Sequence, residues 1–456
     1  MAKKHSYLFD DEHTELVKRY ENYLSGASAG YFDVEEMGRI VDYYLMRGKT
    51  TESLKALEFG KKLHPDSGLL DLKRAKIYLA TGNAQKANRI LKNLVENTDP
   101  EVRFLKMETL IKLGKEREAY ETALNMVEEE EDDKEWMCLD LALIFMTDGS
   151  FDYALDLLKK GEEFDNKNID ILFEKAFCFE QLSNYEAAIE TYTKIIDIDP
   201  YMGEAWFNLG QVHFNRTQYE KALEAYDYAL VINDSDSISL MQKGHVLYQL
   251  NRYAEAIEAY LEYLTFNSEK WSVMTFIGEC YEKLENFPKS LQYYKLSLEE
   301  MPNNYDALVG AAICCLELEE YTESLSYIQS ALELNDKAAD VWVYYAETQI
   351  GLNNIDEALT AYLKSLALDP SQPDTLMAVA SIYMDNSDFD RALKYYELAY
   401  SFDANLEMIE LFMAVAYYYK NDQPNMEKYF RLAVQKNLDA IKLFQEFCPD
   451  ATISQQ

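Results

Sequence analysis

The chain has 456 residues, of which 48% are apolar, and its 44 Lys and Arg against 81 Asp and Glu give a formal net charge of −37. A disordered chain would be less apolar, and 36 Tyr supply large surfaces for burial. The negative charge disfavours binding to nucleic acid or to an anionic membrane, because phosphates would be repelled. Gly (16) and Pro (9) are too scarce for the turns of a many-stranded β protein, which favours an α-rich fold.

The charge is also uneven along the chain. Residues 1–152 hold 22 basic and 30 acidic side chains, whereas residues 305–456 hold 9 and 25. We therefore expect a basic partner to be attracted mostly to the C-terminal two-thirds.

The N-terminal region and the cysteines predict a cytoplasmic protein, and the N-terminal region also predicts a first helix. Acidic residues precede any apolar run, so no signal peptide is expected, and six Cys without CxxC spacing are typical of buried, reduced thiols in the cytoplasm. The span His13–Leu24 is expected to form an amphipathic helix with Leu16, Val17, Tyr20 and Leu24 on one face. We assign residues 1–33 to this N-terminal capping helix and its lead-in, with Asp33 as the N-cap of the next helix.

A 34-residue period follows. Small residues recur in one register from Ala142 to Ala414 and in a second from Ala154 to Ala392. Such a period predicts repeats that bury their apolar faces only against their neighbours. Aromatic residues share the period at Tyr192, Tyr226, Tyr260, Tyr294, Tyr362, Tyr396 and Phe430, with Ile328 in the remaining position.

Each repeat is predicted to contain two helices. Trp206, Leu209 and Gly210 are spaced as on one helical face, and Ala222 and Tyr226 as on a second. The turn between the helices holds residues that tolerate the left-handed conformation ending a helix. These residues are Gly48, Gly82, Gly114, Gly149, Asn251, Asn353 and Asn421.

Twelve repeats are expected within residues 34–440. The acidic run Glu128–Asp133 either disturbs the stack or forms a longer solvated turn between repeats. Residues 441–456 are assigned to a C-terminal capping helix and tail, the helix covering about Asn437–Phe447 with Ile441, Phe444 and Phe447 on its face. The repeats start near residues 34, 68, 100, 135, 169, 203, 237, 271, 305, 339, 373 and 407.

These residues resemble the tetratricopeptide repeat (TPR) family, and the layout is similar to long bacterial TPR proteins. The resemblance implies an all-α fold, a right-handed α–α superhelix (solenoid) of about twelve helix-turn-helix repeats with capping helices at both ends. The family pattern is nearly complete at Trp206, Leu209, Gly210, His213, Ala222 and Tyr226, where His213 replaces Tyr. A second near match has Trp342, Tyr345, Ala346, Ala358, Tyr362 and Pro370.

In TPR proteins the first helix of each repeat lines a concave groove, and the resemblance implies the same here. The side chains left after the packing positions are assigned mix aromatics, amides and acids, so we expect a peptide-binding surface. Alternatively, the Phe side chains pack between adjacent first helices. The central candidates are Phe173, Phe177, Phe207, Asn208, Gln211, Phe214, Met241, Gln242, His245, Tyr248, Phe276 and Glu279. Further candidates are Asp306, Val309, Ile313, Asp340, Val343, Tyr344, Glu347 and Met377.

The resemblance also bears on the ligand. Some TPR proteins hold a peptide backbone with an Asn at the position of Asn208, although a polar residue there can also lack a ligand. The chaperone-binding subgroup clamps a terminal carboxylate with cations and amides, but Phe173, Phe177, Ile238 and Gln242 stand in those places. A C-terminal carboxylate is therefore disfavoured, and a neutral or basic segment with apolar anchors is expected.

We find no sequence basis for catalysis, a cofactor or a metal. GxGxxG, HExxH and GxSxG motifs are absent, and five scattered His form no metal-ligand pattern. The leading hypothesis is a non-catalytic scaffold for protein partners. The alternative is a structural subunit of a larger or self-associating assembly. An enzyme would need a non-repeat domain, and no segment outside the repeats exceeds about 35 residues.

Overall fold

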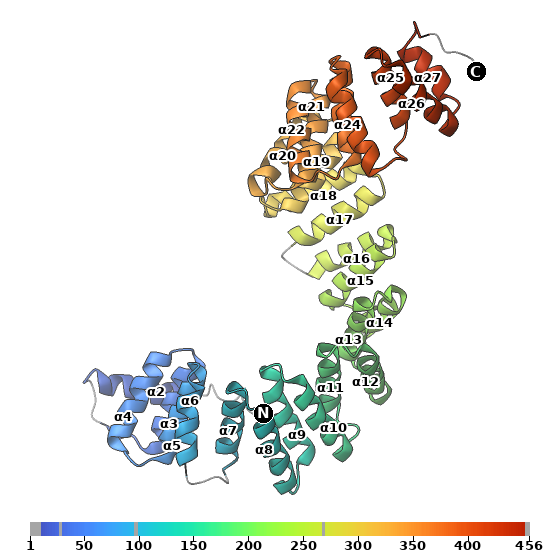
Figure 1. Ribbon diagram of the computed structural model, residues 1–456. Helices are drawn as coiled ribbons and strands as arrows, with labels where there is room; N and C mark the ends of the chain where they lie inside the picture. Colours follow the sequence, from blue (N-terminus) through green and yellow to red (C-terminus); the bar gives the residue numbers. More distant parts are fainter. Residues whose placement is uncertain (1–10, 27–29, 95–98, 267–269, 452–456) are drawn as a thin grey trace. The chain divides into compact units, whose positions relative to one another are not determined.

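The computed structural model describes residues 11–26, 30–94, 99–266 and 270–451, and within them the chain forms 26 helices and no strand (Figure 1). The chain divides into two units, residues 1–234 (unit 1) and residues 235–456 (unit 2), and each is described by itself. Both are built from antiparallel helix pairs whose members we call the first and the second helix. The expected all-α repeat fold is confirmed.

Unit 1 begins with a single helix, α2 (Asp11–Leu24), followed by six helix pairs. Its first helices are α3 (Val34–Met46), α5 (Gly68–Ala80), α7 (Pro100–Lys112), α9 (Lys134–Thr147), α11 (Ile169–Gln181) and α13 (Gly203–Asn215). Its second helices are α4 (Thr50–Leu63), α6 (Ala84–Asn93), α8 (Glu116–Glu129), α10 (Phe151–Phe164), α12 (Tyr185–Ile198) and α14 (Tyr219–Ile232).

Unit 2 contains six further pairs and ends with α27 (Ala440–Phe447). Its first helices are α15 (Ser237–Gln249), α17 (Trp271–Lys283), α19 (Tyr305–Glu317), α21 (Ala339–Gly351), α23 (Pro373–Asp385) and α25 (Ile409–Tyr419). Its second helices are α16 (Tyr253–Phe266), α18 (Phe287–Glu300), α20 (Tyr321–Leu334), α22 (Ile355–Leu368), α24 (Phe389–Phe402) and α26 (Gln423–Lys436).

The acidic run Glu128–Asp133 does not interrupt the core of unit 1. It forms the end of α8 and the link to α9, which begins at Lys134. Val127 before the run and Cys138 after it are both fully buried members of one hydrophobic cluster. The run is therefore a solvated turn between two stacked repeats.

One backbone position has a positive φ in all twelve repeats. The seven Gly and Asn residues predicted to adopt the left-handed conformation all do so. Thr217 has the same conformation, with φ +58°, although a β-branched side chain disfavours it. Two hydrogen bonds that end α13 hold the turn, from the Thr217 N–H to the Phe214 carbonyl (2.8 Å) and from the Gln218 N–H to the His213 carbonyl (2.9 Å). The other exceptions are Ser183, Glu285, Glu319 and Ser387.

The small residues of the first helices admit the tyrosine rings of the second helices. A Cβ added to Gly210 would lie 2.7 Å from the ring of Tyr226, and one added to Gly244 would lie 2.3 Å from the ring of Tyr260. Both tyrosines are almost fully buried, at 0% and 1% exposure. The periodic small and aromatic residues are thus two sides of one contact, which brings the two helices of a pair together.

Helix α2 covers the start of unit 1 as expected. Val17 and Tyr20 are buried in a cluster with Phe32, and Asp33 forms a capping box with Glu36 at the start of α3. Leu24 was expected on the buried face but is 57% exposed, because it lies at the last residue of the helix.

Helix α27 packs on the last pair of unit 2. Phe444 is fully buried, with its ring centroid 4.7 Å from that of Phe430. The helix begins at Ala440, three residues later than expected. Ile441 and Phe447 were also predicted on the packing face, but they are 39% and 44% exposed because so short a helix buries only a narrow stripe.

All six cysteines are buried and free, as the sequence predicted. None of the helices in the described residues combines the length and the apolar character needed to cross a bilayer. The assignment of residues 1–33, 34–440 and 441–456 to cap, array and cap stays a prediction.

Candidate interaction surface

The predicted site residues lie on four first helices, six residues in each unit. Eleven are half-buried and Phe177 is 42% exposed. In unit 1, α11 carries Phe173 and Phe177, and α13 carries Phe207, Asn208, Gln211 and Phe214. In unit 2, α15 carries Met241, Gln242, His245 and Tyr248, and α17 carries Phe276 and Glu279. We call the surface formed by such side chains the first-helix face of each unit.

Three of the four phenylalanines of this set in unit 1 rest on the second helix of their own pair, whereas the ring of Phe177 lies 6.1 Å from that of Phe151 on α10, in the preceding pair. The ring of Phe173 lies 6.1 Å from that of Tyr192, and the ring of Phe207 lies 5.7 Å from that of Tyr226. The predicted alternative placed the Phe side chains between adjacent first helices, whereas these contacts lie within a pair. Each ring has one supported side and retains some exposed area.

The two amides of α13 differ in their partners. Gln211 accepts a hydrogen bond from the Tyr226 hydroxyl (3.2 Å), which fixes its carboxamide. Asn208 is half-buried and forms no hydrogen bond with any residue that the structure describes. Its donor and acceptor are therefore available to an extended backbone.

An aromatic cluster occupies the first-helix face of unit 2. His245 Nδ1 and the Tyr260 hydroxyl are 2.8 Å apart, and the His245 ring meets that of Phe276 edge-on at 4.7 Å. Burial lowers the pKa of His245. The imidazole is therefore neutral at pH 7 and brings no positive charge to the cluster.

Tyrosine hydroxyls from the second helices reach polar groups of the first helices. Tyr192 donates to Glu180 (2.7 Å) in unit 1, and Tyr294 donates to Glu282 (2.8 Å) in unit 2. Sequence reasoning treated these tyrosines as packing residues only. The sequence did contain a signal for these hydrogen bonds, because Glu180 in α11 and Glu282 in α17 stand at the same position of their helices.

Glu279 lies in an acidic environment. Burial raises its pKa to about 7, the charges of Asp306 and Glu282 add to this effect, and Lys283 opposes it. No Lys or Arg among the described residues forms an ion pair with Glu279 or Asp306. Near neutral pH, protonation therefore removes part of the negative charge that no Lys or Arg neutralises at this position.

At one repeat junction of unit 1, between α5 and α7, the equivalent positions hold an ion pair. When the first residue of each first helix is counted as position 1, Glu279 and Asp306 stand at position 9 of one repeat and position 2 of the next. Lys76 and Glu101 occupy these positions in unit 1 and are paired, and Lys73 also contacts Glu101 at 3.3 Å. Although burial opposes ionisation, hydrogen bonds and charge from the two lysines hold the pKa of Glu101 below its ordinary value.

The acidic character of unit 2 extends from α17 to α21. Burial and the charge of Glu317 raise the pKa of Glu347. Burial also raises the pKa of Tyr344, with contributions from Asp340 and Glu347. The first-helix face of this unit thus combines half-buried aromatic rings with carboxylates that lack cationic partners within the described residues.

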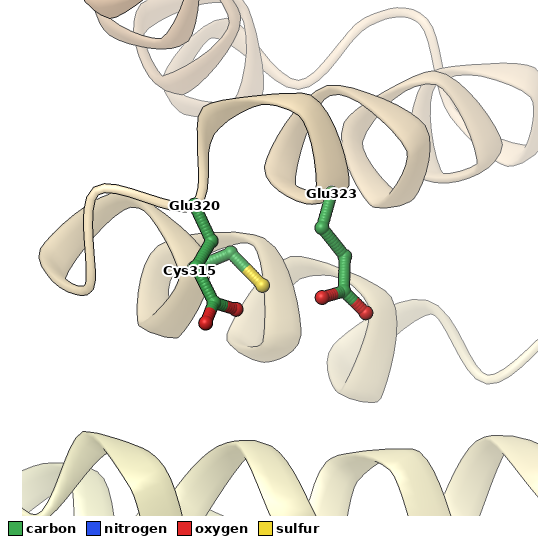
Figure 2. A group of neighbouring side chains, drawn as sticks. All are labelled: Cys315, Glu320 and Glu323. Atoms are coloured by element: carbon green, nitrogen blue, oxygen red, sulfur yellow. The ribbon is translucent and has the colours of Figure 1, made fainter.

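Cys315, Glu320 and Glu323 form a group of neighbouring side chains with metal-ligand chemistry (Figure 2). The Glu323 carboxylate already forms an ion pair with Lys295 at 2.8 Å. Burial raises the pKa of the Cys315 thiol to about 12. A metal would have to displace a lysine and deprotonate a buried thiol, so the group fits a structural ion pair better than a metal site.

Comparison with known families identifies repeats across the middle of the chain. Three family models described as tetratricopeptide repeat match residues 169–201, residues 203–236, and residues 241–305 with 346–406. None of the curated proteins matches the chain.

Solved structures with similar folds include several TPR proteins. YrrB, described as a TPR protein with an unusual peptide-binding site, is 23% identical; the match covers 42% of this chain and 98% of YrrB, with a TM-score of 0.38. A tetratricopeptide repeat protein from Parabacteroides merdae is 19% identical over 54% of this chain and 98% of its own, with a TM-score of 0.41. The C-terminal part of a TPR repeat-containing protein from Cytophaga hutchinsonii is 17% identical over 52% and 98%, with a TM-score of 0.46.

Proposed function

Because the chain belongs to the tetratricopeptide repeat family, we propose that it is a non-catalytic interaction scaffold whose first-helix faces bind neutral or basic protein segments with apolar anchors. The observation that carries the proposal is the pair Glu279 and Asp306, two acids at positions that hold Lys76 and Glu101 in unit 1. A Lys or Arg of a partner would supply the missing cation. Glu279 would then release its proton on binding.

The aromatic side chains supply the apolar part of the interaction. Phe177 is 42% exposed, and Phe207 and Phe276 are half-buried against tyrosines of the second helices. Rings supported on one side lose little conformational entropy when a partner covers the other side. Such contacts contribute mostly to a slow dissociation rate.

Asn208 has a different role in the proposal. Its carboxamide is free of hydrogen bonds within the described part of the chain and lies beside Phe207 in the sequence. A carboxamide pairs with both the N–H and the carbonyl of an extended backbone. It therefore aligns the partner's main chain while Phe207 contacts a side chain.

Electrostatic attraction sets the expected association rate. Unit 2 holds 35 Asp and Glu against 15 Lys and Arg. A basic segment would be attracted over distances of about 10 Å at moderate salt and less at high salt. The same excess of acids disfavours nucleic acid, an anionic membrane and a terminal carboxylate as ligands.

An affinity capture with the full chain from a cell lysate tests the proposal. The baits are the wild type, the double variant Glu279→Gln/Asp306→Asn, and the double variant Phe207→Ala/Asn208→Ala, with Glu333→Gln, at an exposed position of α20, as the control. We expect proteins captured by the wild type and the control to be depleted at least tenfold with one or both double variants. Equal capture by all four baits would contradict the proposal.

The second candidate function is that of a structural subunit that associates with its own kind. Exposed aromatic residues such as Tyr201, at 81% exposure, favour it. The net charge of −37 opposes it, because two copies repel each other. Light scattering over a hundredfold range of protein concentration distinguishes the two, since a constant monomer mass argues against self-association.

A further inference from the structure

An aromatic pocket lies at the C-terminal end of unit 2. Its volume is about 350 Å³, and α23, α24, α25 and α27 all contribute to its wall. Of these helices, α24, α25 and α27 are labelled at the orange-to-red end of the chain in Figure 1. Six of its lining residues carry the argument: Met384, Asp385, Phe389, Phe412, Tyr419 and Phe447.

Aromatic rings form much of the pocket lining. Phe389 stacks on Tyr419 with centroids 5.1 Å apart, and Phe412 meets Phe447 edge-on at 6.1 Å. Tyr419 and Phe447 are each 44% exposed. Aromatic area that remains open to water inside a hollow favours an apolar occupant.

The capping helix completes the pocket. Tyr419 of α25 donates a hydrogen bond from its hydroxyl to the Phe447 carbonyl at 2.7 Å, which ties the end of α27 to α25. Phe444 anchors α27 in the core at 0% exposure. The exposed Phe447, which contradicted the predicted packing face, is therefore held in place as a pocket wall.

The charge of the pocket is negative. Among its lining residues, Asp385 is the one charged side chain. Burial raises the pKa of Tyr396 to about 12, a hydrogen bond with Ser381 opposes this, and the charge of Asp385 adds to it. The nearby cation Lys420 is already paired with Asp390 at 2.6 Å. An apolar group with an adjacent positive charge complements a pocket that has an aromatic lining and one carboxylate.

We propose that this pocket binds one large apolar side chain of a protein partner, with a neighbouring Lys or Arg of the same segment facing Asp385. The site is separate from the Glu279 region and rests on the proposed function only in that its occupant is a protein segment. The aromatic lining supplies the affinity. Asp385 selects the basic neighbour.

A random twelve-residue peptide library displayed on phage, selected on the immobilised full chain, tests this proposal. We expect enriched peptides to contain a Leu, Met, Phe or Trp next to a Lys or Arg. The affinity of these peptides is expected to fall about tenfold for Phe447→Ser, which removes one aromatic wall of the pocket. Asp385→Lys should keep the apolar preference and replace the basic neighbour with an acidic one, while Glu333→Lys should change neither.

The outcomes separate this proposal from the proposed function. Peptides lost with Glu279→Lys but retained by Phe447→Ser and Asp385→Lys would overturn the pocket proposal and leave the proposed function standing. A selection that enriches no peptide on the wild type would contradict both. Because Asp385 is exposed and forms no ion pair in the described residues, its variant tests the pocket even if Phe447→Ser loosens α27.

Discussion

Lys76 with Glu101 in unit 1 and Glu279 with Asp306 in unit 2 occupy the same two positions of the repeat. In unit 1 the two positions hold a cation and an anion, which pair. In unit 2 they hold two acids, one of which has its pKa raised to about 7. The repeat thus determines where the side chains meet, while their identity decides whether the contact is an ion pair or a pair of acids.

The largest expected effect comes from removing the buried cation of unit 1. Lys73 has a side chain 9% exposed and pairs with Asp42 at 2.7 Å as well as with Glu101. Lys73→Met leaves both acids without this partner, so the free energy of unfolding should fall by about 3 kcal/mol. Urea unfolding and hydrogen exchange in α5 measure the change.

The matched control is Lys115→Met, whose exposed partner is Glu118. We expect it to change the free energy of unfolding by less than about 0.5 kcal/mol. Equal effects of Lys73→Met and Lys115→Met would show that the cluster in unit 1 does not contribute to stability.

Lys76→Glu converts the ion pair of unit 1 into the acid pair of unit 2. Destabilisation of about 1 kcal/mol is expected at pH 7, because Glu101 would face a like charge while Lys73 still neutralises part of it. Lys76→Gln serves as the control without a new charge, and thermal unfolding at pH 7 and pH 4 is the measurement. If the Glu and Gln variants unfold at the same temperature at pH 7, the like charge at this position does not destabilise unit 1, and the prediction is contradicted.

Glu279→Gln removes the titration near neutral pH that the acid pair of unit 2 contributes. The folded-state pKa of about 7 lies above the ordinary 4.5, so wild-type Glu279 contributes stability below about pH 4.5 and loses it as the pH rises through 7. The variant should therefore gain at least about 1 kcal/mol over the wild type at pH 8, where the wild-type carboxyl is ionised, and almost nothing at pH 4.5. Chemical unfolding at both pH values measures this, and a gain that does not depend on pH would exclude the raised pKa as its cause.

The smallest effect concerns the turn that both units share. Thr217 has a φ of +58° in unit 1, and Ser387 has a φ of +59° in unit 2. Because Asn tolerates this conformation better, Thr217→Asn and Ser387→Asn should each stabilise the protein by about 0.5 kcal/mol. Thr193→Asn, within α12, is the control, since the two residues have similar helix propensity.

Most of the fold was predictable from the 34-residue period. It located the first helices to within about two residues, even at α25, where Met408 has a left-handed backbone and the helix begins at Ile409. The turn position was recognised where Gly or Asn stands there. The left-handed conformation was not predicted at Thr217 and Ser183, because the hydrogen bonds of the turn outweigh the local preference of the side chain.

Less of the candidate site was predictable. The sequence placed Glu279 and Asp306 on one face, but not next to each other, because that needs the register of adjacent repeats. It also did not predict that Phe207 rests on Tyr226, since periodicity gives the face of a helix and not the direction of a ring. Phe447 was assigned to a buried face because a helix of eight residues has too few turns for its exposed side to be identified.

The six buried cysteines give the molecule internal reporters of its motion. Cys138 and Cys178 lie in unit 1, and Cys280, Cys314, Cys315 and Cys448 lie in unit 2. Burial raises the pKa of each thiol, so a thiol-specific reagent reacts only after the surrounding helices separate. The rate at which each cysteine is alkylated would thus report how often the helices around it separate. No cysteine has to be introduced by mutation for this measurement.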